Sequence, residues 1–526
     1  MGVLLTATFV ATALPAAATA TPTAPRSISA YVNSAPVPGS APTLRTEQGV
    51  LRGRDLGASD FFGTVPYAAP PTGPLRWKSP RSAAPWQGVR QATAPSPACA
   101  QTANSNGPRS EREDCLYMDV WRPKTAAVRA GRAPVLFWIF GGGGINGAGS
   151  QYDAQALAQE TGSIVVTVNH RLGWLGFLAL PALTREAGVS GQYGFLDQIA
   201  GLRWLKRNAR ALGGDPHRVT VGGQSAGGRA VCRLMASPQA KGLFQQAIIQ
   251  SGACNAEQLA PRETAGTAFA TKLGCADTTD QLACLRRTGV GTMLDRPEPP
   301  PGTPTIGGNA LPMDPRLAIE TGRISRVPVL IGNTSDENRP YPGISQPASP
   351  QAYRDWVHRS YPSLANEVLR QYDDMAPPDA AGAVASDPDR VCRAWKIENT
   401  LARHTPVYAY EFADTTAPSE VATPGFSWGA YHTTELEYLF SFTRWDGSPK
   451  FLTGLNREQQ RLAREMRARW GTFLHTGAPR GSRWPGYHED RQVTMQFQLP
   501  GARLDGDFAD SHRCRFWDEH GLIRLA

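Results

Sequence analysis

Short, continuous apolar runs alternate with segments of helical periodicity between residues 134 and 250. The runs at 135–140 and 164–168 are typical of parallel strands, because such strands are covered on both faces. Apolar side chains recur at helical spacing over 198–212, and two glycines end that predicted helix. Further elements of the same kind are strands at 218–221, 243–250, 327–331 and 407–412 and a helix at 226–235. The alternation predicts an α/β fold with a large, mostly parallel sheet and helices on both faces. The more helical and polar segment 255–325 is expected to cap one edge of that sheet.

The first 43 residues differ from the rest in composition. Residues 1–20 combine an apolar run, too short to span a bilayer, with small residues suited to cleavage, which predicts a signal peptide and a secreted protein. No Lys or Arg precedes the run, so an alanine-rich tail or a wrongly placed start remains the alternative. Residues 21–43, rich in Pro, Ala and Thr, are expected to be a flexible leader, and 44–526 a single catalytic domain.

Charge and cysteine content narrow the classes of partner. The net charge of +9 comes from scattered basic residues without interleaved aromatics, which argues against nucleic-acid binding. No later stretch is apolar enough for an integral membrane segment. Eight cysteines fit an oxidising compartment, and none has zinc-ligand spacing, so no metal is expected. Cys275 with Cys284, and Cys99 with Cys115, flank short polar stretches and are candidates for local disulfides.

The sequence Gly-Gln-Ser-Ala-Gly at 223–227 lies after a predicted strand and before a predicted helix. In that context the glycines allow a tight turn that exposes the Ser225 hydroxyl above the sheet edge. The helix that begins there brings a positive dipole end close to the serine. The five-residue pattern is common by chance, so its position between strand and helix carries the prediction of a nucleophile.

Four consecutive glycines, 141–144, follow the first apolar run. Their N–H groups can converge on a developing oxyanion, and loss of one such donor typically costs about 3–4 kcal/mol in the transition state. A phosphate loop would need Gly-Lys-Ser/Thr after the run, where Ile145 and Asn146 stand. A dinucleotide fingerprint would need an acidic residue after the next strand, where residues 169–171 are Asn-His-Arg. An oxyanion hole is the interpretation that remains.

An acid and a histidine should follow the serine along the chain. Asp336 and Glu337 lie just beyond the predicted strand at 327–331, and His432 lies in a later loop. The histidine would accept the serine proton and return it to the leaving alcohol, while the carboxylate would fix its tautomer. The residue types alone leave other histidines open: His170, His217, His404 and His475.

With these residues in place, the chain resembles the type-B carboxylesterase/lipase family, which includes the cholinesterases. The match extends from about Leu44 to Trp517 and contains the segments 65–68, 71–76, 113–121, 168–173, 194–198, 208–216, 223–228, 242–244 and 250–252. The resemblance implies the α/β-hydrolase fold, with inserted helical cap segments. It also implies the following roles: nucleophile Ser225, acid Glu337 in preference to Asp336, base His432, oxyanion donors Gly142, Gly143 and Ala226, and a serine near the triad, Ser251.

The same resemblance implies three disulfides, which are Cys99–Cys115, Cys275–Cys284 and Cys392–Cys514. Native bridges of this kind contribute about 2–4 kcal/mol each. Cys232 and Cys254 remain. Because Cys232 lies about two helical turns beyond the serine and Cys254 follows the next strand, we expect both to be free.

Three departures from the family pattern concern the pocket. Gln224 stands where a glutamate usually precedes the serine, which removes a negative charge beside the histidine. Gly144 replaces a residue that is usually aromatic, which is expected to widen the pocket. No tryptophan lies between Cys99 and Cys115, so the aromatic choline platform of cholinesterases is expected to be absent.

These features together predict a secreted serine carboxylesterase that forms an acyl-enzyme on Ser225. It should act on a small-molecule ester without a cofactor, as a monomer or weak oligomer. A non-catalytic adhesion or binding protein of the same fold is the rival from another class, and it is weakened because the serine, acid, histidine and glycine run are all retained. A lipase, or a carbamate or amide hydrolase, stays open within the fold.

Overall fold

The structure is a computed structural model that describes residues 41–276, 280–339, 349–423, 425–479 and 484–523. The predicted signal peptide, 1–20, and nearly all of the predicted leader, 21–43, therefore lie outside the described residues. The chain from Ala41 to Ala526 forms one unit by its internal contacts.

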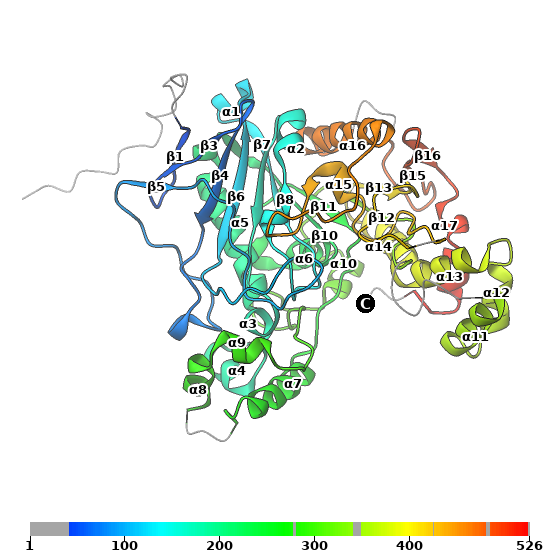
Figure 1. Cartoon of the computed structure of the whole chain (residues 1–526), viewed down its shortest axis with the longest axis horizontal. Coiled ribbons are helices and arrows are strands. Elements are labelled where there is room, and N and C mark those ends of the chain that lie inside the picture. Colours follow the sequence, from blue (N-terminus) through cyan, green and yellow to red (C-terminus); the bar gives the residue numbers. More distant parts are fainter. Residues whose placement is uncertain (1–40, 277–279, 340–348, 424, 480–483, 524–526) are drawn as a thin grey trace, which may run out of the picture. The chain divides into compact units, whose positions relative to one another are not determined.

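A central sheet lies at the middle of the fold (Figure 1). In the described part of the chain it has eleven strands, in the order β16-β15-β13-β12-β11-β10-β7-β9-β6-β4-β3. The strands from β15 through β9 in this order run parallel, and the edge strands β16, β6, β4 and β3 pair antiparallel. The bounds along the chain are β3 (Arg54–Asp55), β4 (Ser59–Pro66), β6 (Tyr117–Pro123), β7 (Ala133–Ile139), β9 (Ile164–Val168), β10 (Gly214–Gln224), β11 (Gln246–Gln250), β12 (Val329–Thr334), β13 (Val407–Phe412), β15 (Thr494–Phe497) and β16 (Arg503–Asp505). The prediction of a mostly parallel α/β sheet is confirmed.

Helices and two small sheets surround this sheet. The longer helices are α5 (Tyr193–Leu212), α6 (Ala226–Ala236), α7 (Leu259–Lys272), α11 (Pro350–Ser360), α13 (Pro377–Ser386), α14 (Cys392–Ala402) and α16 (Arg457–Thr476). The shorter helices are α1 (Ala126–Arg129), α2 (Gln155–Thr161), α3 (Gly173–Phe177), α4 (Pro181–Ala187), α8 (Gln281–Arg287), α9 (Val290–Leu294), α10 (Pro315–Glu320), α12 (Ala365–Gln371), α15 (Leu436–Leu439), α17 (Phe508–Ser511) and α18 (Cys514–Glu519). The small sheets contain β1 (Thr43–Arg45), β2 (Val50–Arg52) and β5 (Val89–Gln91), and β8 (Tyr152–Asp153) with β14 (Ser441–Phe442).

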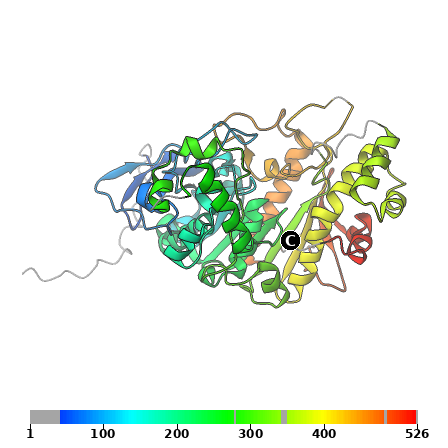
Figure 2. The ribbon, with the colours of Figure 1, turned by 90° about the horizontal axis from the view of Figure 1, so that it is seen from below.

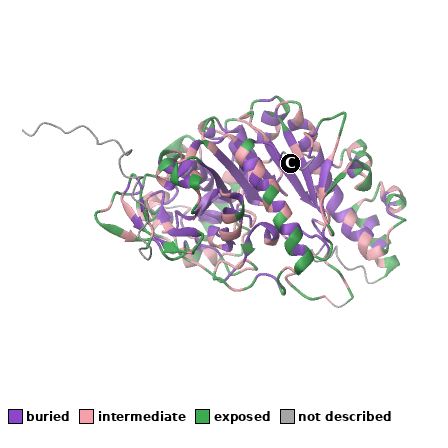
Figure 3. Cartoon of the chain, turned by 90° about the horizontal axis from the view of Figure 1, so that it is seen from above, coloured by how far each residue is buried: buried purple, intermediate pink, exposed green. Residues whose placement is uncertain are grey.

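Both faces of the sheet are covered, as continuous apolar strands require. The ring of Phe137 in β7 lies close to the Cα of Gly201 in α5. The next residue, Trp138, points to the other face and packs on Phe440 at a centroid distance of 4.9 Å. Figure 2 shows helices on both sides of the strands, and Figure 3 shows that the strands between them are buried.

The largest boundary difference among the helices is at α5, which starts at Tyr193 rather than at 198. A Cβ at Gly194 would lie 2.4 Å from the carbonyl oxygen of Arg171, so this early turn packs directly on backbone and needs glycine. Glycine has a low helix propensity, which is why the periodicity is weak where the helix begins.

The segment 255–325 contains α7–α10, in agreement with its predicted helical character. Phe269 of α7 stacks on Trp174 of α3 at a centroid distance of 4.0 Å. Further along, Gly302 contacts the glycine run: a Cβ placed on Gly144 would lie 2.1 Å from the carbonyl oxygen of Gly302. The segment therefore reaches the edge of the sheet at which the candidate nucleophile lies.

The described part of the chain contains four disulfides, and three of them are the pairs implied by the resemblance. The fourth joins Cys232 to Cys254, with a Cα–Cα distance of 5.5 Å, so the expectation that both are free was wrong. The reach between them is short because the turn after β11 lies against α6: a Cβ on Gly252 would be 2.6 Å from the backbone of Gly228. Cys232 follows Gly228 by one helical turn, and Cys254 follows Gly252 by two residues.

Candidate functional site

Ser225 connects β10 to α6 with an unusual backbone. Its φ of 56° and ψ of −119° are rare for a residue with a side chain, and such strain is typical of a serine on a strand-to-helix elbow. Its N–H donates to the carbonyl oxygen of Gln250 at 2.8 Å. Gly227 makes the turn possible, since a Cβ there would lie 1.9 Å from the carbonyl oxygen of Ile139. The result is a half-buried hydroxyl above the carboxyl end of β10.

Three N–H groups lie around this turn. Gly142 and Gly143 have φ values of 104° and 70°, which favour glycine, and Ala226 is the first residue of α6. The N–H at the start of a helix has no acceptor within that helix. Among the described residues, none of the three donates to a protein acceptor, so all remain available to an oxygen anion.

His432 and Glu337 form a buried pair. Nδ1 of His432 lies 2.6 Å from Oε2 of Glu337, and the other carboxylate oxygen accepts the N–H of Thr334 at 3.1 Å. Glu337 follows β12, and His432 lies in the loop after β13, so neighbouring parallel strands bring the two together.

Burial and nearby charges determine the protonation states of Glu337 and His432. Burial alone would raise the pKa of Glu337, but His432 and the guanidinium of Arg390 lower it to about 2. The pKa of His432 is lowered from its usual value, mainly by burial and then by Arg390, although Glu337 acts in the opposite direction. At neutral pH the ring is therefore a neutral base beside an ionised carboxylate.

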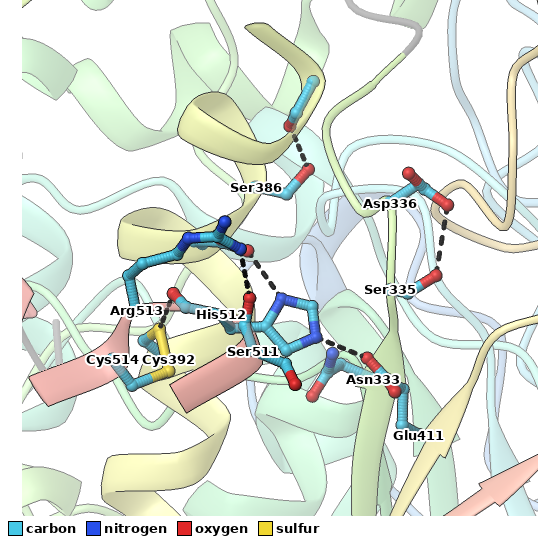
Figure 4. Close-up of polar contacts among 12 residues, drawn as sticks. Asn333, Ser335, Asp336, Ser386, Cys392, Glu411, Ser511, His512, Arg513 and Cys514 are labelled. Carbon is cyan, nitrogen blue, oxygen red and sulfur yellow. Dashed lines mark hydrogen bonds and ion pairs between the residues drawn. A yellow bond between two sulfur atoms is a disulfide. The ribbon is translucent and has the colours of Figure 1, made fainter. Parts of the chain in front are cut away.

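Asp336 has a different place. Its Oδ2 accepts the N–H of Ala430 at 3.0 Å and lies 3.1 Å from the Ser335 hydroxyl, a contact visible in Figure 4. A Cβ on Gly429 would lie 2.5 Å from the same oxygen. Asp336 thus holds the backbone of the loop that carries His432, while Glu337 contacts the ring.

Two side chains flank the other ring nitrogen. Nε2 of His432 lies 3.5 Å from Nε2 of Gln224 and 3.5 Å from Nη1 of Arg390. Within the described residues it makes no hydrogen bond to Ser225. Catalytic hydrogen bonds are often long without substrate and tighten in the complex, so this geometry is compatible with proton transfer from the serine.

Ser251 and Glu435 lie beneath the pair. Ser251 has a φ of 48°, and its buried hydroxyl has no hydrogen-bond partner in the described chain. Burial, and then the nearby Glu337, raises the pKa of Glu435 to about 8. Glu435 is therefore mainly neutral at pH 7 and adds little negative charge next to the pair.

A cavity of about 240 Å³ opens beside Ser225. Its lining residues are Ser225, Arg229, Ser251, Gly252, Ala253, Asp389, Arg390, Arg393 and Ala394. The arginines at 390 and 393 were not predicted from the sequence, in which only the cysteine of the segment 387–393 has an expected role. Its charged residues at 387, 389, 390 and 393 were the available signal, but nothing local relates them to Ser225.

No group of three or more His, Cys, Asp or Glu side chains is placed to hold a metal ion in the ranges that the structure describes. No described helix is long and apolar enough to cross a bilayer.

Comparisons with known proteins agree on one family. The model of the carboxylesterase family matches residues 40–517. Fumonisin B1 esterase of Sphingopyxis macrogoltabida is 33% identical over 86% of this chain and 85% of its own, and acetylcholinesterase of Bungarus fasciatus is 31% identical over 93% and 88%. Among solved structures, a thermophilic PNB esterase superposes with a TM-score of 0.74 at 28% identity, over 91% of this chain and 100% of that one.

Proposed function

The chain belongs to the carboxylesterase family and is a carboxylic-ester hydrolase, and we propose that it works through an acyl-enzyme on Ser225 with His432 and Glu337 as partners. In the first half of the reaction the Ser225 hydroxyl attacks the ester carbonyl while Nε2 of His432 takes its proton. Glu337 keeps the Nδ1 proton in place and stabilises the imidazolium that forms. The imidazolium then protonates the leaving alcohol.

In the second half, a water molecule gives its proton to His432 and attacks the acyl carbonyl, which releases the acid and restores the Ser225 hydroxyl. The N–H groups of Gly142, Gly143 and Ala226 are assigned to the oxyanion in both halves. No metal or organic cofactor takes part in these steps.

The observation that carries the proposal is the 2.6 Å contact between His432 and Glu337. A histidine that is buried against a carboxylate indicates a functional role. Because the carboxylate accepts the proton on Nδ1, Nε2 is left as the basic nitrogen. The strained, half-buried serine at the carboxyl end of β10 supplies the proton that such a base would take.

Covalent labelling tests the nucleophile directly. Ser225 should attack the phosphorus of diethyl p-nitrophenyl phosphate, release p-nitrophenolate and keep the diethylphosphoryl group. The tryptic peptide 219–229 contains Ser225 as its sole serine, so mass spectrometry with fragmentation can locate the adduct. We expect one adduct per chain and a parallel loss of esterase activity. Loss of activity with an adduct on another residue would overturn the assignment, and heat-denatured protein serves as the unlabelled control.

The pH profile should depend on Arg390, whose charge is one of the causes that lower the pKa of His432. In Arg390→Met that pKa should rise, so more of the ring is protonated and inactive in mild acid. The acid limb of kcat/KM for a neutral ester, which reports the free enzyme, should therefore move to higher pH. Arg354→Met, which removes an exposed charge from α11, is the control. An unmoved or acid-shifted limb in Arg390→Met would contradict this electrostatic role.

We also propose that the protein is secreted. The predicted signal at 1–20 supports this, as do four disulfides, which persist in oxidising compartments.

A further inference from the structure

The cavity beside Ser225 has a strongly basic lining. Three guanidinium groups, those of Arg229, Arg390 and Arg393, face one carboxylate, that of Asp389, among its lining residues. Arg229 lies one helical turn after Ser225 in α6, and the other two come from α14 and the turn before it. The lining thus carries an excess of positive charge next to the hydroxyl that attacks the ester.

Asp389 offsets only part of this charge. Its side chain is 52% exposed, and it accepts hydrogen bonds from Arg393 at 2.9 Å and Asn338 at 3.0 Å. Arg390 reaches it only at 3.8 Å and lies equally far from the carboxylate of Glu337, at 3.8 Å. Nε of Arg390 and Nε of Arg393 are buried and have no hydrogen-bond partner among the described residues. A buried donor without a partner is unfavourable, and an anionic ligand would supply the acceptor that it lacks.

The two arginines are held on a rigid support. Residues Asp387–Val391 form a π-helical turn, a feature that is frequent at functional sites. Asp387 is fixed by His512 at 2.8 Å and by the hydroxyl of Tyr372 at 2.8 Å. Figure 4 shows His512 reaching on its other side to Glu411, at 2.7 Å. Burial alone would lower the pKa of His512, but the carboxylates of Asp387 and Glu411 raise it well above its usual value, so the ring is an imidazolium at neutral pH.

From this geometry we infer that the enzyme prefers esters that carry a second, free carboxylate, and that Arg393 with Arg390 and Arg229 binds it. The inference rests on the proposed function, because the cavity is defined by its contact with Ser225. Guanidinium groups bind carboxylates through paired, charge-assisted hydrogen bonds. Because the support is rigid, little ordering is required when the anion binds.

The test compares acids with neutral amides of the same shape. For a carboxylate in the acyl part, the substrates are the mono-p-nitrophenyl ester of adipic acid and that of adipic acid monoamide. For a carboxylate in the alcohol part, they are 4-(butanoyloxy)benzoate and 4-(butanoyloxy)benzamide. In the wild type, the acid-to-amide ratio of kcat/KM should be roughly ten or more in one pair, in the range of charge-assisted hydrogen bonds. A ratio of one or below in both pairs would overturn the inference.

Variants connect the preference to the cavity. Arg393→Met should lower the ratio roughly tenfold, Arg393→Lys should keep part of it, and Arg354→Met should leave it unchanged. The ratio does not depend on the fraction of folded enzyme, so partial misfolding does not hide the result. If Arg393→Met yields no protein, inhibition of the wild-type enzyme is measured instead, with the amide-bearing ester as substrate. Adipate should inhibit and adipamide should not, and equal inhibition would contradict the inference.

Failure of the inference differs from failure of the proposed function. If amides are hydrolysed as well as acids and Ser225 is labelled, the mechanism stands and the anion preference falls. If neither is hydrolysed and Ser225 is not labelled, the mechanism itself is wrong.

Discussion

Replacing Ser225 by alanine should lower turnover of p-nitrophenyl butanoate by about a million-fold, the loss measured when a serine hydrolase of another fold loses its nucleophile. Alanine keeps the Cβ and removes only the oxygen that would form the acyl-enzyme. The oxyanion donors and the cavity stay, so the residual rate should still exceed that in water. A spectrophotometric assay of p-nitrophenolate release measures both rates, at enzyme concentrations high enough to detect the residual rate of the variant. The ratio of the wild-type rate to the variant rate gives the loss of turnover.

The fold should survive this change. The Ser225 hydroxyl has no hydrogen-bond partner among the described residues, and alanine meets the same backbone strain as serine. The thermal midpoint of Ser225→Ala should therefore match that of the wild type. Ser360→Ala, an exposed serine at the end of α11, is the matched control for both measurements. Appreciable turnover by Ser225→Ala with an unchanged midpoint would exclude the acyl-enzyme mechanism.

The sequence predicted most of the sheet because buried parallel strands are continuous apolar runs. β9 and β13 begin and end where the runs at 164–168 and 407–412 do. The elbow at Ser225 was also predictable, since the glycines that it needs are adjacent in the chain. Local pattern and local structure coincide in these cases.

Features that depend on contacts between distant segments were not predictable in the same way. The Cys232–Cys254 bridge exists because Gly228 and Gly252 let the α6 backbone touch the turn after β11. Each glycine alone resembles many others in the chain. Arg390 is likewise far from Ser225 in sequence, and only the order of strands in the sheet places the turn before α14 beside the elbow.

Gly144 shows how a single residue can be interpreted in two ways. From the sequence, its lack of a side chain predicts a wider pocket. In the structure its φ is 79°, and a Cβ would lie 2.1 Å from the carbonyl oxygen of Gly302. Glycine is thus required for close backbone approach at this position, so an aromatic residue there would displace the loop around Gly302 before it could fill the pocket.

Local sequence pattern does not distinguish Asp336 from Glu337 as the acid of the triad, because both carboxylates follow the same strand. Adjacent side chains leave the backbone in different directions, and here Glu337 reaches His432 while Asp336 reaches the N–H of Ala430. We expect Glu337→Gln to lower kcat roughly ten-thousand-fold, by analogy with the loss seen when a triad acid elsewhere becomes an amide. An amide can present its N–H to Nδ1 and stabilise the wrong tautomer of the ring.

Asp336→Asn is the matched control, since it makes the same acid-to-amide change one residue away. It keeps an oxygen that can accept the N–H of Ala430, so kcat should fall tenfold or less. A loss of roughly that size corresponds to one altered neutral hydrogen bond. The pH profile separates the two roles further. Glu337→Gln removes the negative charge that favours the imidazolium, so the pKa of His432 should fall further and the acid limb of the remaining activity should move to lower pH. If Asp336→Asn inactivates the enzyme and Glu337→Gln does not, the acid has been assigned to the wrong carboxylate and the loop between β12 and His432 must adopt another arrangement during the reaction.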